Sequence, residues 1–469
     1  MRIGIDFGTT HTSAAFYDGR QTQFIPLEPQ SPNPHLLRSL IYVTRTQRVF
    51  LGLAAARTFL REDTGRPVVY EEKVVGTIEN TVAQQYKGPL DPDGPITIIY
   101  DVTVEEDVGA QGRLLQSIKT GLRSGSYEGT NIFGHYYSLQ ELISLILSHV
   151  RTQAEATLQA EVRQATIGRP VRFADDPAAD RQAEQRLGEA AALAGFTQVT
   201  FAPEPVAAAY TYLSQTQQPE TALIFDFGGG TLDFTVLRSD ATGAREILAT
   251  HGVAVGGDDL DSTLMRSSVA PHFGTQSPID VNYDGRPLPF PEDLANLLAH
   301  WQTIPLLSRP ERLAVIQRAK RYSPDCDKFV ALESLVMRNH GFALFERIEQ
   351  AKRVLSDEER AHLAMQADAI DLAIDITRTD FNLAIGEELA QARQGVREVV
   401  ALAGVAKQDV DVVVTTGGSS VIPIFRQMLA REFPTARIVP ADTFGSVASG
   451  LALCAYAEAG AVRAGDKII

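Results

Sequence analysis

Two aspartates in this sequence each stand at the end of an apolar run that leads into a turn of glycine and threonine. Asp6 lies in IDFGTT, at residues 5–10, and Asp226 lies in FDFGGGT, at residues 225–231. Such turns leave backbone N–H groups pointing outward, where they can bind phosphate oxygens, and glycine allows a close approach. An aspartate beside the turn can hold a divalent cation through water, as magnesium prefers. The two motifs together predict a cleft in which two matching halves bind a polyphosphate and a magnesium ion.

A third glycine turn supports the same prediction. The stretch VVVTTGGSSVIP, at residues 412–423, again leads from an apolar run into glycines and serines. Other phosphate-binding patterns are absent, because the sequence has neither a GxxxxGK[ST] loop nor a GxGxxG turn after a predicted strand. P-loop and Rossmann-type folds are therefore disfavoured.

The elements that must position these turns alternate along the chain, because strand-like apolar runs are followed by runs of helical periodicity. This alternation is typical of an α/β protein. We expect strands at residues 2–7, 164–170, 221–227 and 411–418. We expect helices at residues 139–158, 180–194, 205–213, 346–355, 380–402, 422–432 and 445–462. Two less regular stretches, 64–112 and 271–310, hold turn dipeptides and are interpreted as insertions, either peripheral or partner-binding.

The repeated strand–turn–strand motif divides the chain into two predicted lobes. Lobe I takes residues 1–215 and 440–469, with an insertion at about 64–112. Lobe II takes residues 216–439, with an insertion at about 271–345. A chain of 469 residues is long enough for two lobes with a core each.

Composition excludes several classes of function. The formal net charge of −15 disfavours nucleic acid as a partner, because phosphate backbones need a concentrated basic surface. Cys326 and Cys454 are too few for a metal cluster or a disulfide framework. The N-terminus lacks the pattern of a signal peptide, and no apolar stretch is long enough to span a membrane. We therefore expect a cytoplasmic protein without a membrane partner.

In combination, the motifs resemble the nucleotide-binding domain of DnaK-type heat-shock chaperones, the heat shock protein 70 family. GIDFGTT, FDFGGGTLDFTVL, VGGDDLD, EQAKRVLS and TGGSSVIP occur in that family's order. PEPVAAAY and DTFGSVASGLAL resemble its connecting and closing helices. The resemblance implies an α/β, actin-like ATPase fold with two duplicated lobes around a cleft. It also implies ATP or ADP as the ligand, Mg²⁺ as the metal, K⁺ as a further candidate ion, and ATP hydrolysis as the reaction.

The resemblance further implies roles for individual residues. Asp6 and Asp226 match the family's magnesium-site carboxylates, and Asp233 matches an acid beside the phosphates. Glu204 matches a carboxylate near the attacking water, and Lys119 matches the lysine near the γ-phosphate. The phosphate loops match Gly8, Thr9, Thr10, Gly228, Gly229, Gly230 and Thr231, and the two threonines Thr9 and Thr231 can bond the γ-phosphate or water. The nucleoside side matches Gly256, Gly257, Glu349, Lys352, Arg353, Ser356, Gly417, Gly418, Ser419, Val421 and Asp442.

Several departures from the family pattern leave alternatives open. His11 stands where the family usually has a tyrosine-like residue, and we interpret it as a polar pocket wall. Val421 stands where an arginine usually stacks on adenine, which predicts weaker nucleotide affinity. Asp258 and Asp261 either reach the ribose or cap a helix.

The chain ends at Ile469, and its length and motifs together resemble a short bacterial subgroup of the family that lacks the peptide-binding domain. We expect a chaperone-like switch with an unknown protein partner or client. The alternatives are a nucleotide-binding scaffold without activity, a sugar kinase, and a filament-forming ATPase.

Overall fold

The computed structural model describes most of the chain. The described residues are 1–82, 96–174, 176–214, 219–240, 245–280, 287–441 and 445–464. Two separate hydrophobic cores, one in each half of the chain, contain Ile5 and Leu147 in the first half and Phe225 and Leu335 in the second. No helix among the described residues is both long and apolar enough to cross a membrane.

The first half is built on a sheet with the strand order β13-β12-β1-β2-β3, in which β4 also pairs with β2. The strands are β1 (Arg2–Phe7), β2 (His11–Tyr17), β3 (Thr22–Phe24), β4 (Leu37–Arg38), β12 (Gln164–Arg169) and β13 (Gln198–Pro203). The central strand β1 runs antiparallel to β2 and parallel to β12. The strands predicted at 2–7 and 164–170 are confirmed.

The second half repeats this arrangement in the order β16-β15-β14-β19-β20. The strands are β14 (Glu220–Phe227), β15 (Leu232–Ser239), β16 (Arg245–Val253), β19 (Val412–Thr416) and β20 (Arg437–Pro440). Strand β14 is antiparallel to β15 and parallel to β19, so it takes the place that β1 has in the first sheet. The predicted repeat is confirmed, and each central strand carries its aspartate next to a hairpin turn.

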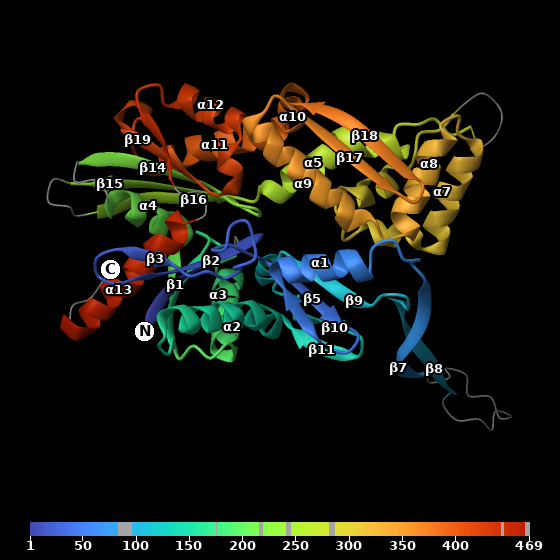
Figure 1. The fold of residues 1–469 in the computed structure, drawn as a ribbon, viewed down its shortest axis with the longest axis horizontal. Coiled ribbons are helices and arrows are strands. Elements are labelled where there is room, and N and C mark those ends of the chain that lie inside the picture. Colours follow the sequence, from blue (N-terminus) through green and yellow to red (C-terminus); the bar gives the residue numbers. More distant parts are fainter. Residues whose placement is uncertain are drawn as a thin grey trace, which may run out of the picture.

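Two helices lie between the sheets, α4 (Glu204–Ser214) and α13 (Ser446–Ala464) (Figure 1). Ala207 and Leu451 from these helices share a hydrophobic cluster with Ile224 and Val414 of the second sheet. The two helices cross closely, because a Cβ at Gly450 would lie 1.7 Å from the carbonyl oxygen of Ala207. The helices predicted at 205–213 and 445–462 are confirmed.

The remaining helices near the sheets are α2 (Leu139–Leu158), α3 (Pro177–Leu193), α10 (Arg378–Ala384), α11 (Gly386–Leu402) and α12 (Pro423–Glu432). Ser138 and Glu141 form a capping box at the start of α2, which explains its sharp beginning. The single helix predicted over 380–402 is wrong in one respect, because the chain breaks it at Ile385. Ile385 leaves the helical conformation, with φ −83° and ψ 24°, directly before Gly386, a residue that disfavours the interior of a helix.

An outer part of the first half stands above its sheet. It holds β5 (Leu40–Thr44), β6 (Val49–Leu51), α1 (Gly52–Glu62), β9 (Gly112–Gln116), η1 (Ile118–Arg123), β10 (Gly129–Ile132) and β11 (His135–Ser138). The stretch 64–112, expected to be irregular, instead forms a long ribbon of β7 (Tyr70–Val82) and β8 (Ile96–Asp107). Figure 1 shows this ribbon extending away from the rest of the chain. Valine, isoleucine and threonine are frequent in both strands, and they favour an extended backbone.

The outer part of the second half is mainly helical. Its helices are α5 (Gly257–Leu264), η2 (Met265–Val269), η3 (Ala270–Phe273), α6 (Glu292–Asn296), η4 (Leu297–Ala299), η5 (Ile304–Ser308), α7 (Pro310–Tyr322), α8 (Cys326–Met337) and α9 (Gly341–Asp357). A hairpin of β17 (Arg360–Ala367) and β18 (Ile370–Thr377) packs on it with alternating buried residues. Two short turns of helix, η6 (Lys407–Asp409) and η7 (Gly418–Val421), flank β19.

The two outer parts touch each other. Trp301 Nε1 donates a hydrogen bond of 2.6 Å to Gln116 Oε1, and the rings of Phe59 and Phe342 meet edge to face at 5.3 Å. The backbone N–H of Gly65 donates to the carbonyl of Arg338 at 2.8 Å. The halves are therefore joined at the outer end as well as through α4 and α13.

Candidate functional site

A cavity of about 650 Å³ lies between the two halves, and it gathers nearly all of the predicted site residues. Its lining includes Asp6, Gly8, Thr9, Thr10, His11, Lys119, Glu204, Asp226, Gly228, Gly229, Gly230, Thr231, Asp233, Gly257, Glu349, Lys352, Arg353, Ser356, Gly417, Gly418, Ser419 and Val421. Gly256 does not line it. A Cβ at Gly256 would lie 2.1 Å from the carbonyl oxygen of Gly229, so this residue packs behind the second glycine turn. Asp442 lies outside the described residues.

The tips of the two glycine turns contact each other at the cavity. The first joins β1 to β2 and the second joins β14 to β15. A Cβ at Gly229 would lie 2.3 Å from Thr10 Cγ2, and one at Gly230 would lie 2.9 Å from Thr9 Oγ1. Only glycine permits this contact, because any side chain would push the turns apart. The backbone N–H groups of both turns can therefore approach one bound polyphosphate.

Four carboxylates stand beside these turns. Asp226 and Asp233 face each other in the register of β14 and β15, and Asp6 takes the matching position at the end of β1. Burial, with the charge of Glu204, raises the pKa of Asp6 to about 7 and that of Asp233 to about 6. Burial and the same neighbour raise the pKa of Asp226 well above its usual range. The carboxylates thus repel one another and favour a bound cation.

One cation from the chain faces this group. Lys119, in η1, places Nζ 2.5 Å from Glu204 Oε1, and both side chains are buried. Four carboxyl groups beside one ammonium fit a divalent cation, because a bound cation would offset the burial and mutual repulsion that raise the pKa of Asp6, Asp226 and Asp233. No group of three or more His, Cys, Asp or Glu side chains in the described part of the chain is placed to hold a metal ion directly. The residues therefore fit a magnesium ion held largely by water and phosphate oxygens, as that ion prefers.

Helix α9 supplies the other end of the cavity. Lys352 Nζ donates to Asp261 Oδ2 at 2.6 Å and to the carbonyl of Gly257 at 2.8 Å. Arg353 pairs with Glu349 one turn away. Burial acts to raise the pKa of Glu349, but Arg353, Arg38 and Lys352 outweigh it, so that pKa is lowered. Glu349 is therefore an ionised acceptor in the cavity.

Asp258 and Asp261, for which the sequence allowed either a ribose contact or a helix cap, also line the cavity. The capping acid of α5 is Asp259, which accepts a hydrogen bond of 2.7 Å from the backbone N–H of Gly256. Asp258 accepts from Ser117 Oγ at 3.1 Å, while Asp261 Oδ1 is buried and has no hydrogen-bond partner. Burial raises the pKa of Asp261 to about 7 although Lys352 acts against it.

His11 and Val421, the two residues that depart from the family pattern, have different surroundings. Burial is the main cause that lowers the pKa of His11 to about 4; Glu349 acts to raise this pKa, while Arg38 and Arg353 act to lower it, so the ring is neutral at neutral pH. The role of His11 as a polar wall stays a prediction. Val421 lines the cavity and is 42% exposed, so it presents an apolar surface there.

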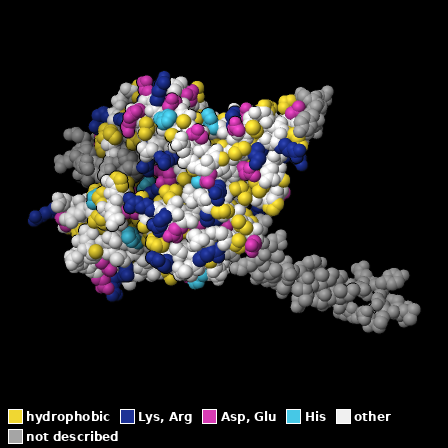
Figure 2. Space-filling view, turned by 45° about the vertical axis from the view of Figure 1, so that its right-hand side comes forward, with side chains coloured by type: hydrophobic (Ala, Val, Ile, Leu, Met, Phe, Trp, Pro, Cys, Tyr) yellow, Lys and Arg dark blue, Asp and Glu magenta, His cyan; other side chains and the backbone are white. Residues whose placement is uncertain are grey.

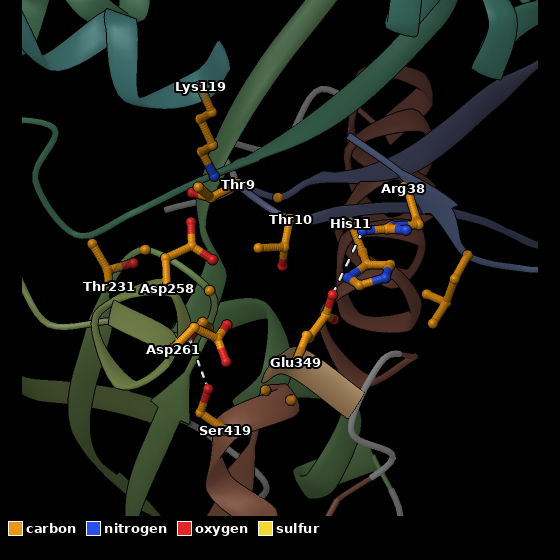
Figure 3. Close-up of a pocket in the computed structure, with 18 of the residues that line it drawn as sticks. Thr9, Thr10, His11, Arg38, Lys119, Thr231, Asp258, Asp261, Glu349 and Ser419 are labelled. Carbon is orange, nitrogen blue, oxygen red and sulfur yellow. Dashed lines mark hydrogen bonds and ion pairs between the residues drawn. The ribbon is translucent and has the colours of Figure 1, made fainter. Parts of the chain in front are cut away.

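Sequence reasoning missed two arginines that line the cavity, Arg38 and Arg123. Arg123 Nη2 donates to the carbonyl of Gly230 at 3.1 Å and so supports the second turn. Figure 3 shows Arg38 beside His11, with Glu349 facing them from α9. Neither arginine belongs to a glycine motif, and only the pairing of β4 with β2 brings Arg38 to the cavity.

Two matching sheets around a cavity lined by paired glycine turns define an actin-like ATPase fold. The family described as Hsp70 protein matches residues 117–289 and 338–468 of the chain. These residues make up more than half of its length, and the chain belongs to the Hsp70 family. The match supports an ATP-binding, Hsp70-like ATPase domain, since members of this family are typically ATPases. It contains Lys119, Glu204 and Asp226, whereas Asp6 and Arg38 precede the matched residues.

Proposed function

We propose that this chain binds ATP together with a magnesium ion and hydrolyses the terminal phosphate. The observation that carries the proposal is the group of carboxylates around Asp226, which faces Lys119 where two glycine turns meet. Phosphoryl transfer requires positioning and charge neutralisation more than covalent chemistry, and this group offers both.

In this proposal each residue has a definite task. Backbone N–H groups of the two turns bind phosphate oxygens, and Thr9 and Thr231 bond the terminal phosphate or the attacking water. Lys119 lies beside the terminal phosphate and stabilises the charge that develops there. Glu204 or Asp233 orients the water and accepts its proton. A magnesium ion would supply further charge neutralisation, and Asp6 and Asp226 would hold it.

The proposed output is a change in the relative position of two lobes, residues 1–215 with 440–469 and residues 216–439. Support comes from the position of the cavity, since both halves contribute side chains to it. ATP would draw the lobes together, and a partner protein would read the closed state. We propose a chaperone-like role for this switch, with a protein partner or client. In Figure 2, acidic and basic side chains are both spread over the visible face, which suits a soluble switch in the cytoplasm.

A second candidate is a nucleotide-binding scaffold without hydrolysis. Val421 leaves this alternative open, because it departs from the family pattern at the position of a cationic stacking partner and would weaken binding of the base. The carboxylates and Lys119 favour hydrolysis instead, since a scaffold would not need them.

Calorimetric titration with ATP, in the presence and absence of magnesium, tests the proposed ligand. We expect magnesium to strengthen binding to the unmodified chain and to have little effect on Asp226→Asn. Asp371→Asn is the matched control, because Asp371 is an exposed aspartate on β18 outside the cavity. If the unmodified chain binds ATP with the same affinity in the presence and absence of magnesium, the proposal is contradicted.

A further inference from the structure

Arg38 reaches across the cavity from β4 to α9. Its Nη1 donates to Glu346 Oε2 at 2.9 Å, and its Nη2 donates to Glu346 Oε1 at 2.7 Å. The same Nη2 lies 3.5 Å from Glu349 Oε2. The chain thus has a two-pronged ion pair between its first half and the helix that carries the predicted nucleoside contacts. The dashed line in Figure 3 marks the contact with Glu349.

The surroundings make this ion pair stronger than a surface pair. The Arg38 side chain is 18% exposed, and those of Glu346 and Glu349 are 29% and 26% exposed. Arg38 also separates the main cavity from a small cavity of about 70 Å³, which it lines together with both glutamates. Limited contact with water reduces screening, and the paired geometry of guanidinium and carboxylate fixes both groups.

Arg38 supplies a positive charge next to His11 and Glu349. It stands opposite His11 in the pairing of β2 with β4, and the His11 ring is neutral at neutral pH. Glu349 is therefore held from one side by Arg38 and from the other by Arg353. An ionised carboxylate fixed in this way keeps its remaining lone pairs free to accept hydrogen bonds from hydroxyl groups of a ligand.

We propose that Arg38 is a positioning residue that orients Glu349 to accept a ribose hydroxyl, so that the site selects ribonucleotides over deoxynucleotides. The inference rests on the proposed function, because it requires a nucleotide in this cavity. A site built to bond a hydroxyl rejects an analogue that lacks it, since its partly buried carboxylate is then left without the ligand's hydrogen bond. Without Arg38, Glu349 can turn away and the preference is lost.

The test compares the affinities of ATP, 2′-deoxyATP and 3′-deoxyATP by calorimetric titration of the full chain. The unmodified chain should bind ATP at least about 10-fold more tightly than one of the two deoxynucleotides, because a hydrogen bond to a charged group is at stake. Arg38→Gln should bind ATP about 10-fold more weakly and the discriminating analogue almost unchanged, so the ratio falls towards one. Arg397→Gln, which removes an arginine from an ion pair outside the cavity, should keep the ratio.

Two further variants separate positioning from a general loss of structure. Arg38→Lys keeps the charge but cannot form the paired geometry, so it should recover only part of the ratio. Arg38→Glu combined with Glu346→Arg exchanges the partners and should restore part of the ratio that each single change removes. If Arg38→Gln does not fold, Arg38→Lys carries the test.

The outcomes distinguish this inference from the proposed function. An unmodified chain that binds none of the three nucleotides would overturn both. A chain that binds ATP, with the same ratio in Arg38→Gln and Arg38→Lys as in the unmodified protein, would overturn the role of Arg38 alone.

Discussion

Lys119 Nζ lies 2.5 Å from Glu204 Oε1, and this buried ion pair joins η1 to the start of α4. A buried pair loses much hydration, so it is weak evidence for a stabilising role. Its position matters more, because the two residues stand among the carboxylates next to both glycine turns. A lysine that is already dehydrated and fixed can meet the charge on a phosphate without further rearrangement.

Replacing Lys119 should therefore reduce hydrolysis far more than binding. We expect Lys119→Met to lower the single-turnover rate of ATP cleavage by about 10²–10³-fold, as when one preorganised donor is removed from a charged transition state. The affinity for ATP should change much less, because the backbone groups of the turns remain. Unchanged cleavage by Lys119→Met would exclude Lys119 from the reaction. Lys320→Met is the control, since Lys320 pairs with Glu333 outside the cavity.

The contact between the two turns predicts different effects for neighbouring glycines. Gly229→Ala should weaken ATP binding strongly, because the new Cβ would lie 2.3 Å from Thr10 Cγ2 and force the turns apart. Gly228→Ala should weaken it less, since the nearest atom to its Cβ, the carbonyl oxygen of Thr231, is 3.5 Å away. Titration of both variants with ATP measures the difference. Equal losses would mean that the turns do not meet as described.

The crossing of α4 and α13 should be intolerant of any side chain. Gly450→Ala would place a Cβ 1.7 Å from the carbonyl oxygen of Ala207, and we expect it to lower the free energy of unfolding by about 1–3 kcal/mol. Gly386→Ala, at the start of α11, meets no atom within 4 Å and should be neutral or stabilise by up to about 1 kcal/mol. Urea denaturation of both variants is the measurement. A neutral Gly450→Ala would show that the helices are farther apart.

The free energy of unfolding should depend on pH through Glu432. Hydrogen bonds from Arg397, together with Lys407, lower the pKa of Glu432 from 4.5 to about 2. A lowered carboxyl pKa adds stability above pH 4.5, and this contribution disappears as the pH falls from about 4.5 towards 2. Glu432→Gln should cost about 1 kcal/mol at neutral pH, because solvent screens the partly exposed partners, less than that near pH 3, and almost nothing once the pH reaches about 2.

Urea denaturation between neutral pH and pH 3 tests this dependence. Arg397→Gln should show the same trend, since it removes a partner of the same carboxylate. A cost that stays constant with pH would mean that Glu432 acts by packing rather than by charge.

Much of the fold could be predicted because the central strands combine strong apolar runs with glycine turns. The repeat of the Asp6 motif at Asp226 predicts two duplicated lobes, and the structure has two sheets of matching strand order. The ribbon of β7 and β8 could not be predicted, because its turn dipeptides and scattered charges mask the strand pattern. The break at Ile385 also escapes prediction, since it affects a single residue before Gly386 and the apolar periodicity continues on both sides of it.

The candidate site shows the same division. Residues within motifs, such as Thr9 and Glu349, could be predicted to share a cavity, and they do. Arg38 could not, because its place is set by a two-residue strand that pairs with β2. The sequence places Gly256 in the lining, but it lies behind the lining. It is the N-cap residue of α5, and its missing side chain lets the start of this helix pack against the second turn. The roles of these residues remain predictions for the experiments above.

The central claim is that a metal-assisted cleavage of ATP occurs beside Asp226. Single-turnover hydrolysis of ATP by the purified chain with magnesium tests it most directly, with Asp226→Asn and Asp371→Asn compared under the same conditions. The account predicts cleavage by the unmodified chain and by Asp371→Asn, and loss of most of it in Asp226→Asn, which should still fold. Cleavage by Asp226→Asn at the unmodified rate would contradict the metal-site assignment, and ATP that is bound but never cleaved by the unmodified chain would contradict the ATPase itself.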